Sequence, residues 1–128
     1  MNAGTFLSQS ALVAIGGAAG AWLRFAAGRM VGFGQFPWAT LGVNVAGSLA
    51  MGLLAGWLAR YGQGGELWRL LLGVGLLGGF TTFSAFSLEL ALMIERGTFA
   101  TAFAYAAVSV LAGVAGLFAG LALIRVAA

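Results

Sequence analysis

Polar side chains in this apolar chain recur at a spacing that could line a path for an ion. Two stripes share that spacing: Thr40, Asn44 and Ser48, and Thr101, Tyr105 and Ser109. Residues four apart lie on one face of a helix. In a membrane such a face must bond to a neighbouring helix or line water. Either stripe alone favours bonding between helices, whereas two matching stripes favour a narrow wet path.

A third polar cluster, GGFTTFSAF at residues 78–86, interrupts an otherwise apolar segment. Glycine weakens a helix, and Thr and Ser hydroxyls can bond back to the backbone. A helix broken here has carbonyl oxygens without helical donors, which membranes tolerate only where the backbone is buried or lines a cavity. Such carbonyls, converging from two chains, would suit a hard monovalent cation.

Phe83 and Phe86 follow the expected break and lie three residues apart, on one helix face. A phenyl ring is negative on its faces and positive at its edge. Ring edges turned toward a path would attract an anion weakly. The alternative is that both rings pack the helix bundle.

The composition places the chain in a membrane. It is 62% hydrophobic and 7% charged, with no His and no Cys, whereas soluble domains carry about 25% charged residues. Disulfides and the usual zinc sites are excluded. Paired carboxylates and phosphate-binding loops are also missing, so we expect no enzyme. The net charge of +3 comes from scattered arginines, which does not indicate nucleic-acid binding.

Four segments are apolar enough and long enough, at about 20 residues, to cross a bilayer. They cover approximately residues 6–27, 37–59, 67–94 and 99–125. We therefore predict a single all-α domain over residues 1–128, with four transmembrane helices and the third broken in mid-membrane. Glycine pairs four residues apart predict close helix packing: Gly16 and Gly20, Gly52 and Gly56, and Gly116 and Gly120.

The arginines are balanced between the two ends of this predicted bundle. One end holds Arg60, Arg69 and Arg125, and the other holds Arg24, Arg29 and Arg96. Orientation in the membrane follows an imbalance of basic residues. A balanced chain can insert both ways, so two copies can pair as an antiparallel homodimer.

The motifs together resemble the Fluc (CrcB) family of fluoride channels. The resemblance rests on GGFTTFSAFSLE in the third segment, GGAAGAWLRF in the first and GVNVAGSLAMG in the second, and it covers nearly the whole chain. It implies an antiparallel dual-topology homodimer in the bacterial inner membrane. It also implies passive export of cytoplasmic fluoride, which would confer fluoride resistance.

The resemblance also implies particular site residues. A structural Na⁺ would be held by the backbone carbonyls of Gly78 and Thr81. The implied fluoride pore matches Asn44, Phe83, Phe86, Tyr105 and Ser109, and Thr40 joins it as part of the first polar stripe. The next position of the second stripe is Gly113, so the hydroxyl track ends early compared with the family.

Two charged residues and two other functions remain as alternatives. Arg24 is a candidate for an anion vestibule or an anchor at the membrane interface. Glu89 lies in an apolar run, where we expect it to be paired or hydrogen-bonded. A small multidrug-type, proton-coupled exporter has a similar size, but it needs a membrane carboxylate, and the first segment has none. The other alternative is an assembly subunit that transports nothing.

Overall fold

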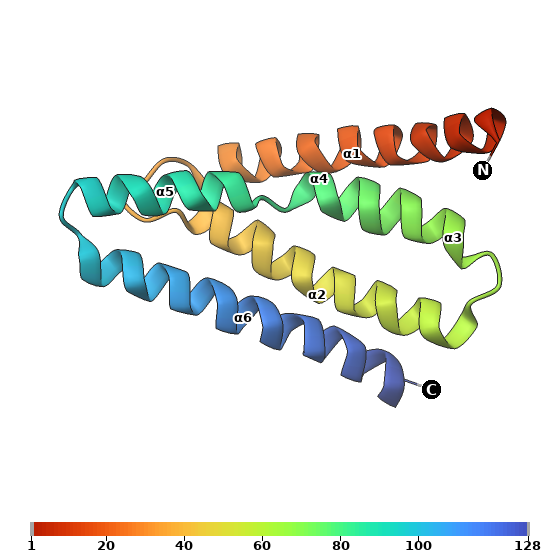
Figure 1. Cartoon of the computed structure of the whole chain (residues 1–128). Coiled ribbons are helices and arrows are strands. Elements are labelled where there is room, and N and C mark those ends of the chain that lie inside the picture. Colours follow the sequence, from red (N-terminus) through yellow and green to blue (C-terminus); the bar gives the residue numbers. More distant parts are fainter. Residues whose placement is uncertain (1, 128) are drawn as a thin grey trace.

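The computed structural model describes residues 2–127, and over that range the ordered elements are helices (Figure 1). The predicted domain also included Met1 and Ala128, which lie outside the described residues. In chain order the elements are α1 (Ala3–Val31), α2 (Trp38–Tyr61), α3 (Gly65–Trp68), η1 (Arg69–Leu77), α4 (Gly78–Phe80), α5 (Phe83–Glu95) and α6 (Phe99–Val126). The segments from α3 to α5 together form the third span.

The four predicted membrane spans are confirmed. Within the described residues they are 29, 24, 31 and 28 residues long, each sufficient to cross a hydrocarbon core of about 30 Å. The first is longer than predicted because its ends are capped. The Asn2 side chain accepts a hydrogen bond from the Thr5 N–H at 2.8 Å, and Gly32 ends the helix at a φ of 79°.

The helices pack as two close pairs, α1 with η1 and α4, and α2 with α6 (Figure 1). Glycines allow both contacts, as their spacing predicts. A Cβ on Gly16 would collide with the Leu71 carbonyl oxygen. In the second pair, a Cβ on Gly52 would collide with the Leu117 carbonyl oxygen. Backbone therefore lies directly against backbone in both pairs.

The segment η1 is a π-helix of nine residues, which the sequence does not indicate. Its Gly73 and Gly75 are buried, and a Cβ on Gly75 would lie 3.0 Å from the Gly16 Cα. π-helical turns are rare and usually short. Here the wider turn lies where the third span presses on α1, and the small residues make room for it.

Little of the molecule is buried. Tyr105 and Met93 are the largest fully buried side chains described, and with Ala102 they form a small cluster between α5 and α6. Large apolar side chains such as Phe83, at 79% exposure, lie on the outer surface. An apolar surface of this extent needs lipid or a second chain to cover it.

Candidate anion pathway

The third span is broken at two threonines. Thr81 and Thr82 are extended, with φ and ψ of −87° and 158° and of −150° and 117°. The Thr81 hydroxyl donates to the Leu77 carbonyl at 2.9 Å and so closes the preceding turn. The Thr82 hydroxyl accepts from the Ala85 N–H at 3.1 Å and so caps α5. The hydroxyls therefore end one helix and begin the next.

Asn44 on α2 fastens the extended residue in place. Its Nδ2 donates to the Thr82 carbonyl at 3.0 Å, and its Oδ1 accepts from the Thr82 N–H at 2.7 Å. The side-chain amide thus pairs with the backbone as a neighbouring strand would. Spacing along the chain does not predict this role, because the two residues lie 38 positions apart. One N–H of Asn44 remains for another acceptor, so its predicted role in the pore stays a prediction.

The break removes helical donors from two carbonyl groups. In a continuous helix the Thr82 N–H would bond to the Gly78 carbonyl and the Ala85 N–H to the Thr81 carbonyl. Here those N–H groups bond instead to Asn44 Oδ1 and to the Thr82 hydroxyl. The carbonyl oxygens of Gly78 and Thr81, the predicted ligands, are thus without their helical N–H partners. They fit a cation, because hard cations prefer oxygen ligands.

Glu89 on α5 ties together α2, α5 and α6. It accepts from the Thr40 hydroxyl at 2.6 Å and from the Tyr105 hydroxyl at 2.7 Å. This confirms the expectation that Glu89 is hydrogen-bonded. Thr40 and Tyr105 are predicted pore residues, and each hydroxyl has only one proton to donate. In this structure both protons are donated to Glu89. Thr40 and Tyr105 position the carboxylate, and their predicted contact with an anion stays a prediction.

The two phenylalanines have different surroundings. Their ring centroids lie 5.8 Å apart, but Phe83 is largely exposed and Phe86 is half-buried. The Phe86 ring packs on Tyr105, with centroids 5.0 Å apart. The Phe86 ring thus packs partly within the protomer, whereas the Phe83 ring is available to a second chain or a ligand, and the predicted contact of both rings with an anion stays a prediction.

Ser109 carries the one buried side-chain polar atom without a hydrogen-bond partner among residues 2–127. Buried hydroxyls almost always find a partner, so an unpaired one calls for an explanation. Ser109 is on α6, one turn beyond Tyr105, on the stripe that the sequence predicts. Its hydroxyl is a donor available to an ion or a water molecule.

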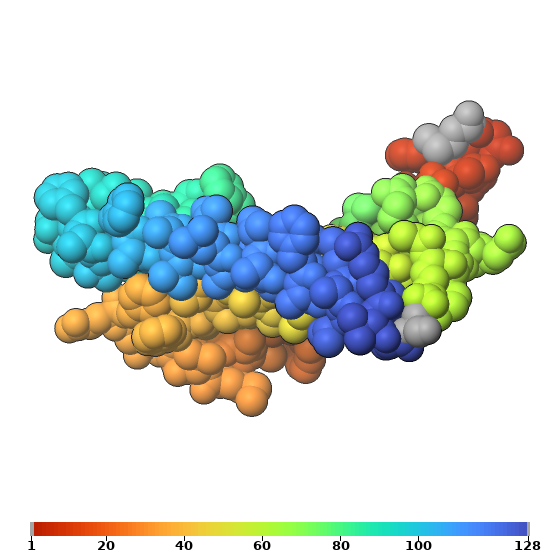
Figure 2. Space-filling view, turned by 90° about the horizontal axis from the view of Figure 1, so that it is seen from below, coloured from red at the N-terminus to blue at the C-terminus, as the bar shows by residue number. Residues whose placement is uncertain are grey.

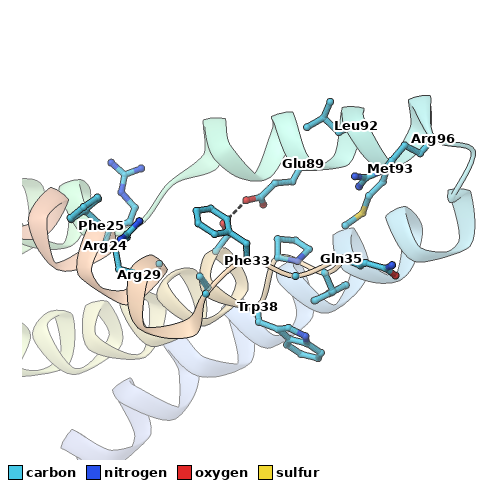
Figure 3. Close-up of a pocket in the computed structure, with 17 residues that line it drawn as sticks. Arg24, Phe25, Arg29, Phe33, Gln35, Trp38, Glu89, Leu92, Met93 and Arg96 are labelled. Carbon is cyan, nitrogen blue, oxygen red and sulfur yellow. Dashed lines mark hydrogen bonds between the residues drawn. The ribbon is translucent and has the colours of Figure 1, made fainter.

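Two adjoining hollows run from one end of the bundle to the break. The outer one has a volume of about 480 Å³, and Arg24 and Arg29 on α1 and Arg96 beyond α5 line it (Figure 3). The inner one, about 290 Å³, reaches Thr82. Arg24 and Thr40 line both. Three guanidinium groups against the single Glu89 carboxylate make this mouth positive, so it favours anions.

Four apolar spans with a break in mid-span define a small multi-pass membrane protein. The family model described as CrcB-like protein, Camphor Resistance (CrcB), matches residues 11–121. The chain therefore belongs to the CrcB family, which confirms the resemblance noted from its motifs.

Bacterial relatives match over nearly their whole length. A protein of Novosphingobium aromaticivorans is 60% identical over 124 residues, covering 93% of this chain and 98% of the relative. A protein of Phenylobacterium zucineum is 59% identical over 119 residues, covering 89% and 93%. A protein of Caulobacter sp. strain K31 is 52% identical over 124 residues, covering 93% and 96%. Each of the three is named a fluoride-specific ion channel.

Proposed function

We propose that this protein is a fluoride channel. The observation that carries the proposal is the arginine-lined passage, which leads from the helix ends to Thr82 at the break. The names of the relatives support fluoride as the anion. Fluoride is small and strongly hydrated, so a channel must replace its water with good donors while binding it weakly enough to release it.

The donors for this task are the Ser109 hydroxyl and the remaining N–H of Asn44. The ring edges of Phe83 and Phe86 supply weaker contacts to the anion. Phe83 points away from its own protomer, since it is largely exposed. Its ring therefore contributes to a path only if a second copy covers it.

The complete channel that we propose is an antiparallel homodimer. Its support is the arginine balance: three arginines line the mouth at one end, and the other three lie at or near the helix ends opposite. The exposed apolar surface supports a second copy in the same way. The two breaks then face each other, and the Gly78 and Thr81 carbonyls would hold a structural Na⁺ that supplies a fixed positive charge.

Export needs neither ATP nor a coupled proton in this proposal. Fluoride enters cells as neutral HF and ionises inside, and the anion then leaves down the membrane potential. That potential supplies about 2.3 kcal/mol per charge per 100 mV. The channel would in this way protect a bacterial cell from fluoride.

The proton-coupled exporter has less support. The carboxylate within the spans that such an exporter could use is Glu89, which already accepts two hydrogen bonds. Glu89 also lies on α5 rather than in the first span, where the exporter alternative expects its carboxylate.

Efflux from proteoliposomes tests the proposal. We expect a fluoride electrode to record rapid release when valinomycin carries the compensating K⁺, and almost none without it, because a passive channel moves charge. Liposomes loaded with chloride should release far less. Fluoride release that requires a proton gradient, or equal release of chloride, would contradict the proposal.

A further inference from the structure

A separate hollow lies at the end of the molecule opposite the arginine-lined mouth, between the last turns of α2 and α6. Its volume is about 250 Å³. Its lining combines two arginines with small and apolar residues: Gly56, Ala59, Arg60, Leu121, Ile124 and Arg125. None of these residues lines the passage that leads to Thr82.

The two helices are parallel and end together, which brings the arginines to one place. Figure 2 shows the dark-blue end of α6 against the yellow-green end of α2. The backbones touch where Gly52 meets Leu117. Arg60 and Arg125 each come eight positions after that contact, about 12 Å further along each helix. Both arginines therefore leave their helices at about the same level and line one hollow.

The hollow carries uncompensated positive charge. The third arginine of this end, Arg69, is paired with Glu66 at 2.8 Å. Within residues 2–127, neither Arg60 nor Arg125 has a salt bridge. Two helix C-termini contribute about half a negative charge each, against two full positive charges. Among the described residues the two arginine charges outweigh these partial charges, so the site attracts an anion.

Aromatic side chains place the hollow at the membrane interface. Trp57 and Trp68 pack with centroids 6.3 Å apart, and Tyr61 lies 6.4 Å from Trp57. Trp and Tyr gather at the level of the lipid headgroups. The Arg60 guanidinium lies 5.6 Å from the Tyr61 ring centroid, at this same level. The arginines therefore meet the phosphate layer.

We propose that this hollow binds the headgroup of an anionic phospholipid. Arg60 and Arg125 donate to its phosphate oxygens, and Leu121 and Ile124 contact the start of an acyl chain. Gly56 lets Ile124 pack closely against α2 at the base of the hollow, since a Cβ on Gly56 would lie 3.1 Å from Ile124. A free phosphate would satisfy the arginines but leave the apolar floor uncovered, so the lipid is the better fit. The proposal does not depend on fluoride conduction.

Native mass spectrometry of the purified protein with phosphatidylglycerol tests this site. Arg60→Gln and Arg125→Gln should each weaken phosphatidylglycerol binding about five-fold, because each removes one surface arginine. Arg69→Gln is the matched control: it removes the same charge at the same end, but from a paired arginine, and should leave binding unchanged. Zwitterionic phosphatidylcholine should bind parent and variants equally.

Four results would overturn the proposal. Unchanged phosphatidylglycerol binding in Arg60→Gln and Arg125→Gln would exclude the site. An equal loss in Arg69→Gln would show that only net charge matters. Binding of glycerol 3-phosphate as tight as that of the lipid would identify a free phosphate as the ligand. A shift of both Arg60→Gln and Arg125→Gln to a smaller species in size-exclusion chromatography would show that a second copy of the chain covers the hollow.

Discussion

Asn44 is bound to the backbone of the broken span, and this changes how its substitution should be read. Its amide makes two hydrogen bonds to Thr82, of 3.0 and 2.7 Å. Any variant that lacks either bond alters the break itself. The fluoride flux of an Asn44 variant should therefore be compared with the stability of the same variant.

Asn44→Asp should lower both stability and flux. The new carboxylate oxygen would face the Thr82 carbonyl in place of a donor, and an unsatisfied buried group costs about 1–3 kcal/mol. Thermal unfolding in detergent and fluoride efflux measure the two effects. The control is Asn2→Asp, the same chemical change at the exposed cap of α1, where Asp caps equally well. A stable, conducting Asn44→Asp would disprove the role of the amide.

Ser109→Ala separates conduction from stability. The hydroxyl has no protein partner within residues 2–127, so its removal should leave the unfolding temperature unchanged or slightly higher. Fluoride efflux should fall about ten-fold or more if the hydroxyl is a donor to the ion, since a hydrogen bond to a charged group contributes about 1.5–3 kcal/mol. Ser8→Ala, at an exposed hydroxyl of α1, should change neither. Parental flux in Ser109→Ala would remove this serine from the path.

Phe83→Ile and Phe86→Ile should both reduce fluoride efflux steeply, because isoleucine keeps bulk but lacks the positive ring edge. Their stabilities should differ. Phe86 packs on Tyr105 and should lose about 1 kcal/mol, whereas Phe83 is exposed in the protomer and should lose little. Efflux and thermal unfolding of both variants check this. Fluoride flux equal to that of the parent in both variants would show that the rings serve only in packing.

At the scale of the elements, helix contacts made backbone to backbone give the bundle little room to adjust. The α1 glycines lie on the backbone of the third span, and α2 and α6 meet in the same manner. Close contacts of this kind restrict movement of the helices that carry the break and Ser109. Rigidity is useful for a path that must fit a small anion and exclude a larger one.

Gly20→Ala tests this rigidity. The added methyl group would overlap the Leu76 carbonyl oxygen, and overpacking costs about 1–3 kcal/mol. Gly42→Ala is the matched control on α2, because nothing lies within 4 Å of its Cβ position. Alanine is the better helix former, so Gly42→Ala should be neutral or stabilising. Equal unfolding temperatures for the two variants would argue against close backbone contact.

At the scale of the whole molecule, the even distribution of arginines between the two ends favours insertion in both orientations. The protomer has an arginine-lined mouth at one end and the Arg60 and Arg125 hollow at the other. If both orientations occur, each leaflet receives both features. The two faces of the assembled protein would then be chemically alike.

Gln63→Cys gives a direct measure of orientation, because the chain has no other cysteine. Gln63 lies in the exposed connector between α2 and α3. A membrane-impermeant thiol reagent should label about half of the cysteines in intact inverted vesicles and all of them after permeabilisation. Labelling of nearly all or nearly none in intact vesicles would establish a single orientation and contradict the antiparallel dimer.

The sequence alone determined the four spans and the position of the break. Span length follows from bilayer thickness and apolar composition, which are local properties of the chain. The break lies at Thr81 and Thr82, whose tendency to bond back to the backbone is also local, whereas Gly78 and Gly79 beside them are helical in α4. The close helix contacts were predictable too, because glycine spacing defines a helix face.

Only the tertiary structure decided what each polar side chain does. Spacing predicts Thr40 and Tyr105 to share a path with Asn44, and the structure adds that both donate to Glu89 and that Asn44 holds the backbone of Thr82. Ser109 alone is left buried without a partner within residues 2–127. Spacing determines which side chains share a helix face. Which donor meets which acceptor depends on how helices distant in sequence are brought together, and a hydrogen bond requires a match of about 3 Å.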